Sequence, residues 1–253
     1  MRVELLPSSI PVSAAQFLVS FLINECVAID AGPLGLLSDL DRQRRVRHVF
    51  LTHEHEDHIA SLPIFLDNVY EPGPECVEIL GDAKLLDLLR RNIFNGRVWP
   101  DFFDLSIGDN CFVRSTPLEP GVSLVREGLT FTPLRVTHSI DTLGFLVDDG
   151  KAAVAFPSDT GPTTTIWKVL DKAPRMDAVF LEVSFPNALA LLAQAIGHHC
   201  PASFATEIGQ LSRPVRWIVV HRKPRFADEI AAELAALNLP NVELVEPGRV
   251  YEF

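Results

Sequence analysis

The sequence predicts a layered α/β sandwich formed by a single domain. Short apolar runs of the strand type alternate with helical patterns from one end of the 253-residue chain to the other. No linker rich in Pro, Gly or Ser divides the chain, so residues 1–253 are expected to share one fold. Mixed sheets covered by helices are the arrangement that buries such a pattern best.

The N-terminal half opens with two apolar runs separated by the turn residues Asn24 and Glu25, and both runs are expected to form strands. Asp82 has the character of a helix N-cap, and the leucines that follow it form one apolar stripe. The expected elements of this half are strands at 17–23, 27–29, 46–51 and 77–80 and helices at 59–66 and 83–93.

The middle of the chain is different in composition. Residues 95–133 are rich in Pro, Gly and Asp and carry only short β-like runs, which predicts an insertion or a lid. Regular alternation then resumes. The expected elements there are strands at 129–136, 143–147, 152–156, 178–183, 218–220 and 242–245 and helices at 189–196 and 230–237.

The charge balance restricts the class of partner. The chain has a formal net charge of −11, and an acidic chain does not favour an extended nucleic-acid surface, since phosphate contacts need clustered Lys and Arg. A small phosphorylated substrate stays possible, because metal ions can meet its charge locally. We expect no membrane segment, because the apolar run at 17–23 is too short to span a bilayer.

The four cysteines, Cys26, Cys76, Cys111 and Cys200, form no C-x-x-C pair. This spacing argues against a zinc knuckle or a thioredoxin-like motif. It favours buried, unpaired cysteines in a reducing compartment. The N-terminus has no long apolar stretch of the signal-peptide type, so a cytoplasmic location is expected.

The most informative segment is the His-x-His-x-Asp-His array of His53, His55, Asp57 and His58, which directly follows a predicted strand. Imidazoles and carboxylates bind borderline metals such as zinc, and one such cluster can supply ligands to two ions. Random composition seldom yields this array, and it therefore predicts a metal site.

Further metal-ligating residue types stand just beyond other predicted strands. They are Asp30, His138, Asp159 and His221. Taken alone, each is more often a turn, capping or surface residue than a ligand. Together with the array they are expected to project from one sheet edge and complete a site for two ions.

With these residues the chain resembles the hydrolases of the metallo-β-lactamase fold. The resemblance implies an αββα sandwich with a dinuclear metal site at the sheet edge, and it places Asp30 behind the ligands as a supporting residue. Zinc suits the ligand types, and manganese or iron also fits. The resemblance implies that His53, His55 and His138 bind one ion, that Asp57, His58 and His221 bind the second, and that Asp159 bridges the two.

Several other segments are similar to class II 3′,5′-cyclic-nucleotide phosphodiesterases. They are residues 182–187, Gly197-His198 with Pro201, residues 221–224, residues 93–100, and residues 20–23 leading into residues 29–32, and the resemblance runs from about residue 17 to about residue 235. It implies hydrolysis of cAMP or cGMP to the 5′-monophosphate by a metal-bridging hydroxide. The chain departs from that pattern at His199 and Cys200, where the family usually has a Leu-Thr type pair, and at Glu56, which replaces a common Leu.

The same resemblance suggests roles around the metals. Asp57 is expected to act in catalysis as a ligand, and His198 to protonate the leaving 3′-oxygen or to orient the group that does so. Glu182 is expected to hold a ligand histidine, since ligating imidazoles usually donate their second N–H to such a group. Three residues are candidates for contact with the substrate or for holding the nearby loop: Ser184, Asn187 and Lys223.

Other functions share this ligand set. The fold also includes tRNA 3′-end endonucleases, but no basic Gly-rich arm for tRNA is visible. It includes lactone and thioester hydrolases, which the segments at 182–187 and 197–198 disfavour. A non-catalytic metal protein is disfavoured by the complete ligand set, and a diiron redox protein by the absence of a flavin domain. The expected partner is a small cyclic nucleotide, and a homodimer is common for the fold.

Overall fold

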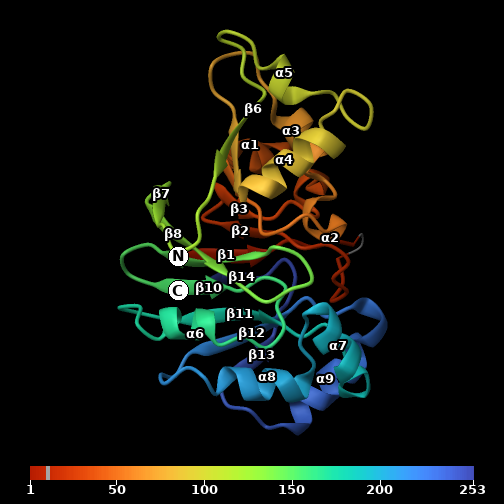
Figure 1. Cartoon of the computed structure of the whole chain (residues 1–253), viewed down its shortest axis with the longest axis vertical. Coiled ribbons are helices and arrows are strands. Elements are labelled where there is room, and N and C mark those ends of the chain that lie inside the picture. The colour runs from red at the N-terminus through yellow and green to blue at the C-terminus, as the bar shows by residue number, and fades with distance from the viewer. Residues whose placement is uncertain (10–11) are drawn as a thin grey trace.

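The computed structural model describes residues 1–9 and 12–253, which form two stacked sheets with helices on both outer sides (Figure 1). Each sheet has seven strands among the described residues. The first sheet contains, in spatial order, β14 (Val250–Glu252), β1 (Arg2–Leu5), β2 (Phe21–Ile23), β3 (Val27–Ile29), β4 (His48–Phe50), β5 (Val77–Gly81) and β6 (Val113–Pro117). The second contains β13 (Val242–Leu244), β12 (Arg216–Val220), β11 (Ala178–Glu182), β10 (Ala153–Phe156), β9 (Leu143–Asp148), β8 (Leu129–Arg135) and β7 (Leu124–Arg126).

The helices divide between the two outer layers and the sheet edge. On the side of the first sheet are α1 (Leu40–Arg45), α3 (Leu62–Val69), α4 (Ala83–Asn92) and α5 (Phe102–Leu105), with α2 (Glu56–Ile59) at its edge (Figure 1). On the side of the second sheet are α6 (Thr165–Leu170), α7 (Ala190–Ile196), α8 (Pro201–Ile208) and α9 (Ala227–Ala236). Short 3-10 turns are η1 (Leu34–Leu36), η2 (Asn187–Leu189) and η3 (Pro224–Phe226).

Three apolar clusters account for the layers. In β3, Val27 and Ile29 face the core between the sheets, whereas Ala28 faces the outer helices. In β11, Phe180 faces the core between the sheets and Leu181 packs with the helices on the other side. Because both faces of these strands are buried, their sequences read as continuous apolar runs rather than as an alternation. The predicted αββα sandwich is confirmed.

The strands that precede the predicted site residues run in one direction within each sheet. β3 and β4 pair in parallel, and so do β10, β11 and β12. β8 and β10 are both antiparallel to β9, which lies between them, so they also share a direction. Residues that follow these strands therefore emerge at the same edge of their sheet.

The N-terminal region differs from its predicted structure. The strand expected at 17–23 begins only at Phe21, and Phe17 is 56% exposed. Strands β1 and β14 were not expected; they pair with each other at the edge of the first sheet, with Val3 opposite Tyr251. Apolar content alone does not reveal a pairing between segments that are so far apart in the chain.

The segment at 95–133 connects the two sheets. It contains α5, then β6 at the edge of the first sheet, then β7 at the edge of the second sheet and the start of β8. Its role as an insertion or lid stays a prediction.

The prediction of four unpaired cysteines is wrong for two of them. Cys76 and Cys111 form a disulfide, whereas Cys26 and Cys200 are free. The two bonded residues precede β5 and β6, which pair in parallel with Val77 opposite Val113, so the register brings the two cysteines together. None of the helices in the described part of the chain combines the length and apolarity that a bilayer crossing requires.

Candidate metal centre

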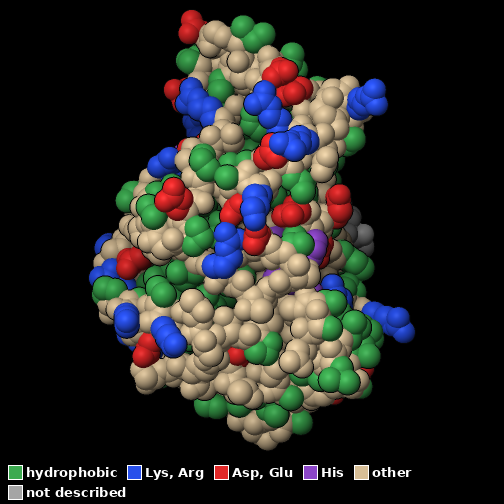
Figure 2. Space-filling model, viewed as in Figure 1, with side chains coloured by type: hydrophobic (Ala, Val, Ile, Leu, Met, Phe, Trp, Pro, Cys, Tyr) green, Lys and Arg blue, Asp and Glu red, His purple; other side chains and the backbone are tan. Residues whose placement is uncertain are grey.

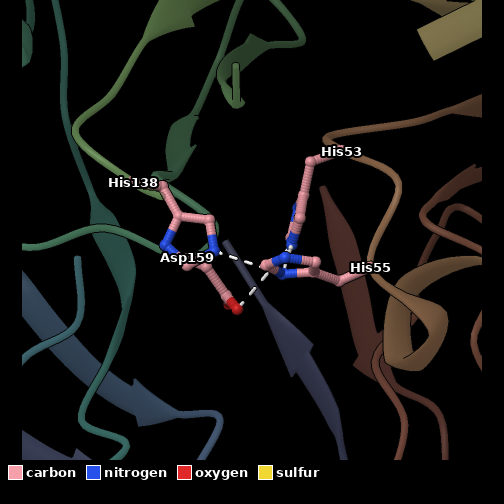
Figure 3. A group of neighbouring side chains, drawn as sticks. All are labelled: His53, His55, His138 and Asp159. Atoms are coloured by element: carbon pink, nitrogen blue, oxygen red, sulfur yellow. Dashed lines mark hydrogen bonds and ion pairs between the residues drawn. The ribbon is translucent and has the colours of Figure 1, made fainter. Parts of the chain in front are cut away.

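The first group of ligand-type side chains is formed by His53, His55 and His138 with Asp159 (Figure 3). His53 and His55 follow β4, and His138 follows β8. His53 Nε2 lies 3.0 Å from His55 Nδ1, and His138 Nε2 lies 3.2 Å from that same atom. The four potential ligand atoms all lie within 4.8 Å of one another, so the group can surround a single ion.

The second group is formed by Asp57, His58 and His221. Asp57 and His58 belong to α2, whereas His221 follows β12 of the other sheet. His221 Nε2 lies 3.1 Å from Asp57 Oδ2. The two sheets thus contribute to one site, and histidine side chains reach the surface there on the face drawn in Figure 2.

Asp159 lies between the two groups and is buried. Its Oδ2 is 3.8 Å from His53 Nε2 in the first group, and its Oδ1 is 3.5 Å from His58 Nε2 in the second. Each carboxylate oxygen therefore faces a different group, which is the arrangement that a bridging ligand needs.

The backbone at the site is locally unusual. Asp30 and His221, each directly after a strand, have φ angles of 62° and 55°, and Ser158 has 60°. Non-glycine residues rarely adopt this left-handed region, and such positions cluster at functional sites. The turn away from each strand directs the side chain into the site.

Hydrogen bonds behind the imidazoles fix which ring nitrogen faces the site. Asp30 Oδ2 accepts from His58 Nδ1 at 2.6 Å, and Asp30 Oδ1 accepts from the Thr52 backbone N–H at 2.8 Å. The Thr52 hydroxyl lies 2.9 Å from His53 Nδ1. The carbonyl of Gly197 accepts from His138 Nδ1 at 2.8 Å. Each of these rings therefore presents Nε2 to the site, as ligating histidines do when their other nitrogen is occupied.

The histidines of the first group resist protonation. Burial lowers the pKa of His53 well below its ordinary value, and it lowers the pKa values of His55 and His138 as well. Neutral imidazoles are the form that binds metal, so this group is ready for an ion at neutral pH.

In the second group, His58 carries a proton more readily. Burial by itself would lower the pKa of His58, but the carboxylates of Asp159 and Asp30 outweigh burial and raise this pKa well above its ordinary value. Burial likewise opposes ionisation of Asp159, yet His221 and His58 hold its pKa well below the usual range. The imidazoles and carboxylates of this half thus compensate one another when no cation is bound.

A third constellation flanks the two groups. His198 Nδ1 lies 2.6 Å from Glu182 Oε1, and Ser184 Oγ donates to Glu182 Oε2 at 2.7 Å. Ser184 Oγ also lies 2.7 Å from His221 Nδ1. Burial by itself would lower the pKa of His198, but the carboxylate of Glu182 outweighs burial and raises this pKa above its ordinary value. Potential ligand atoms of His198, Asp159 and His221, one from each residue, lie within 4.8 Å of one another. His198 therefore lies beside the candidate metal centre.

The remaining predicted residues lie farther out. Asn187 Oδ1 accepts from the Ala202 N–H at 2.8 Å, and the Asn187 N–H donates to Glu233 at 2.8 Å, so this residue ties its loop to α8 and α9. Lys223 Nζ lies 5.6 Å from the centroid of the Phe185 ring, which is itself 5.6 Å from the His198 ring. Lys223 therefore lies at the rim of the site.

Sequence reasoning missed two contacts. Thr52 is part of the array segment, and its hydroxyl after a strand was a usable signal. Gln16 Oε1 accepts from the His221 N–H at 3.1 Å, across 205 residues of sequence, and no local pattern marks it.

The donor set fits divalent cations. His58 Nε2 is buried and has no hydrogen-bond partner in the described part of the chain, although it points toward Asp159. Buried polar atoms are normally paired, so an atom of this kind amid converging imidazoles indicates a ligand position. Imidazole and carboxylate donors suit zinc, and they also accept manganese or iron.

Comparison with known proteins agrees with this geometry. The model of the beta-lactamase superfamily domain matches residues 27–221. The chain belongs to this family. The match spans both ligand groups and the Glu182–His198 pair, and membership of this fold implies divalent metal ions.

Curated relatives carry phosphodiesterase names. A Yersinia pestis protein named "Probable 3',5'-cyclic-nucleotide phosphodiesterase" is 28% identical over 222 residues, covering 78% of this chain and 62% of that protein. An Aliivibrio fischeri protein named "3',5'-cyclic-nucleotide phosphodiesterase" is 29% identical over 159 residues, covering 56% of this chain and 47% of that protein. The chain thus spans less than two thirds of the length of these relatives.

Solved structures share the fold. Unliganded yeast PDE1 matches with a TM-score of 0.75 at 16% identity, covering 98% of both chains. The short form of human tRNase Z matches with a TM-score of 0.70 at 20% identity, covering 100% of this chain and 99% of that chain. At such identities the likeness concerns the metallo-β-lactamase fold alone.

Proposed function

We propose that this protein hydrolyses 3′,5′-cyclic nucleotides such as cAMP or cGMP to 5′-monophosphates at the centre described above. The observation that carries the proposal is His198, a carboxylate-backed imidazole directly beside two ligand groups that share Asp159. The names of the curated relatives support the choice of substrate.

The residues suggest how two ions would be held. His53, His55 and His138 would bind one ion, Asp57, His58 and His221 the other, and Asp159 both, with zinc as the proposed metal. When bound, such ions lower the pKa of a coordinated water and neutralise charge on phosphoryl oxygens.

The protein side chains would then serve the leaving group. The ribose 3′-oxygen leaves poorly as an alkoxide, so it needs a proton as the P–O bond breaks. Although burial opposes it, Glu182 raises the pKa of His198, which favours the protonated ring and suits it to donate a proton from Nε2. Ser184 fixes both Glu182 and His221, and so links the donor to the second ligand group.

Lys223 is proposed to attract the anionic substrate. Its ammonium group lies over the Phe185 ring, beside His198, and it forms no ion pair with a carboxylate in the described part of the chain. By contrast, Lys84 and Arg135, near the His138 loop, pair with Asp141 and Asp82. An unpaired cation at the rim of a site lined by carboxylates favours a phosphate-bearing ligand.

The first test is hydrolysis of 3′,5′-cAMP by the protein loaded with zinc or manganese, followed as formation of 5′-AMP. His55→Ala supplies the blank, and we expect it to abolish turnover. If the metal-loaded protein leaves cAMP and cGMP intact, the proposal is wrong, and RNA 3′-ends and lactones become the substrates to test.

A second test isolates the role of His198. His198→Gln should slow cAMP hydrolysis strongly but have little effect on a p-nitrophenyl phosphodiester, because nitrophenolate leaves without a proton. Equal losses on both substrates would contradict proton donation. His48→Gln, at a partly buried histidine on β4 outside the site, is the matched control.

A further inference from the structure

A segment just before β2 lies against the second ligand group. We call residues 16–20 the strap. Its Gln16 Oε1 accepts from the backbone N–H of His221 at 3.1 Å, and the backbone N–H of Val19 donates to the Asp57 carbonyl at 2.8 Å. Figure 1 shows this red N-terminal segment passing α2, which carries Asp57. The strap thus contacts two residues of the second group, one from each sheet.

The chemistry of the Gln16 contact fixes the orientation of its amide. A backbone N–H can only donate, so the side-chain atom that faces His221 is the oxygen. Gln16 is 6% exposed, and its Nε2 has no hydrogen-bond partner among the described residues. An apolar side chain would fill this space without burying an unpaired donor. Packing therefore does not account for a glutamine here, whereas the bond to His221 does.

His221 needs such support, because its backbone is in the left-handed region with a φ of 55°. Ser184 Oγ lies 3.0 Å from the His221 carbonyl oxygen and 2.7 Å from His221 Nδ1, while Gln16 Oε1 accepts from the His221 N–H. Side chains therefore hold this ligand on both sides of its Cα. A conformation that is costly for a non-glycine residue persists when the surroundings fix it in this way.

The strap has little room to move. A Cβ atom added at Gly32 would lie 2.6 Å from both Val19 N and Val19 O, and 2.3 Å from Asp57 O. The Gly32 N–H also donates to Val19 O at 3.0 Å. The strap, Gly32 and the start of α2 are therefore in direct backbone contact, so a shift of the strap is transmitted to Asp57.

The first ligand group has no such contact. His53 is held by Thr52 and His138 by Gly197, and among the described residues no hydrogen bond joins either one to the strap. Since the strap supports one group only, its effect on metal binding should be one-sided.

We infer that Gln16 is a positioning residue for the second metal ion, acting through the backbone of His221. The inference rests on the two-ion part of the proposed function, and it adds a residue that lies outside the matched family domain. Loss of the amide oxygen should weaken binding of the second ion and leave the affinity for the first ion unchanged.

The test is a calorimetric titration of chelator-treated full-length protein with Zn²⁺, with Co²⁺ absorption as a second readout. Gln16→Met keeps the length but loses the acceptor, and we expect it to weaken the second Kd by about tenfold, the lower end of the range for residues that support ligands. The first Kd should stay within about twofold. Gln16→Glu keeps an oxygen acceptor and should restore the second Kd.

Gln210→Met is the matched control, because this exposed glutamine donates to the Thr163 carbonyl and, within the described part of the chain, bonds to neither ligand group. The inference would be overturned if Gln16→Met left the second Kd unchanged, or if it weakened both Kd values equally. It would also be overturned if the second Kd of Gln16→Glu were no tighter than that of Gln16→Met. So would a wild-type protein that binds only one ion. A protein that binds two ions but does not hydrolyse cAMP would refute the proposed activity and leave this inference intact.

Discussion

The two ligand groups are built from the same side-chain types but are supported differently. In the first group, neutral partners stand behind the rings: the Thr52 hydroxyl behind His53 and the Gly197 carbonyl behind His138. In the second, the carboxylate of Asp30 stands behind His58. Burial accordingly lowers the pKa of His53, whereas neighbouring carboxylates raise the pKa of His58. Burial and the carboxylates around an imidazole, Asp159 in front of His58 as well as Asp30 behind it, therefore decide whether a metal ion must first displace a proton.

The largest expected effect comes from removing the residue that the two groups share. Asp159→Asn keeps the size of the side chain but loses its charge, so both groups lose their common anion. We expect the turnover of cAMP to fall by about three orders of magnitude, as loss of several kcal/mol of metal-dependent stabilisation implies. Metal content, measured by plasma mass spectrometry, should fall below two ions per chain.

Asp171→Asn serves as the control for that experiment, because Asp171 is remote from the ligand groups and bonds Ser212. An Asp159→Asn protein that keeps two ions and most of its activity would show that the groups are independent.

A smaller effect should distinguish the two kinds of support. Asp30→Asn removes the charge behind His58 and should weaken metal binding by about 10- to 100-fold. Thr52→Val removes the hydroxyl behind His53, which also donates to Asp30, but leaves the charge of Asp30 in place, and we expect a loss of less than about tenfold. The measurement is metal affinity at pH 8, where proton competition is weakest. Equal losses in the two variants would mean that charge behind the ring does not matter.

The smallest effect concerns a buried histidine with a neutral partner outside both groups. His199 is fully buried, lies 3.0 Å from the Ser203 hydroxyl, and has no partner at Nε2 in the described part of the chain. Burial lowers its pKa to about 4. The unfolded chain therefore takes up a proton at higher pH than the folded protein. The free energy of unfolding falls as the pH drops from the ordinary histidine pKa of 6.5 toward about 4.

We expect acidification of the metal-free protein from pH 7.5 to 5.5 to cost about 1 kcal/mol of unfolding free energy through this residue. His199→Leu should remove that part of the acid sensitivity. Urea denaturation of both proteins at the two pH values measures the difference. An identical loss in the variant would assign the acid sensitivity to other groups.

Much of the candidate site could be predicted from the residues that directly follow predicted strands. Asp30, Asp159 and His221 were expected at a sheet edge because each follows an apolar run, and the parallel strands of each sheet bring them to the same edge. The array around His53 could be recognised as a metal-binding motif because its members are adjacent in sequence. The fold class was predictable for a similar reason, since runs buried on both faces alternate with amphipathic helices.

The remainder depended on contacts that leave no local trace. Gln16 meets His221 only because the strap lies at the junction of the two sheets. The disulfide of Cys76 and Cys111 depends on the register of β5 and β6, which isolated strand patterns do not specify. The late start of the first predicted strand, with Phe17 exposed, has the same origin, because the strap contacts Asp57 and His221 instead of forming a strand.

The backbone contact at Gly32 has a consequence for attempts to reuse this centre. Because the strap, Gly32 and α2 touch without room for a single methyl group, they can be exchanged only as a set. A peptide carrying the His-x-His-x-Asp-His array, grafted onto another scaffold, would bring four candidate ligands but not the surfaces that hold Asp57 in place. Transfer of the candidate metal centre to a different protein therefore requires these three stretches of chain, with a glycine at their meeting point, in addition to the segments that carry His138, Asp159 and His221.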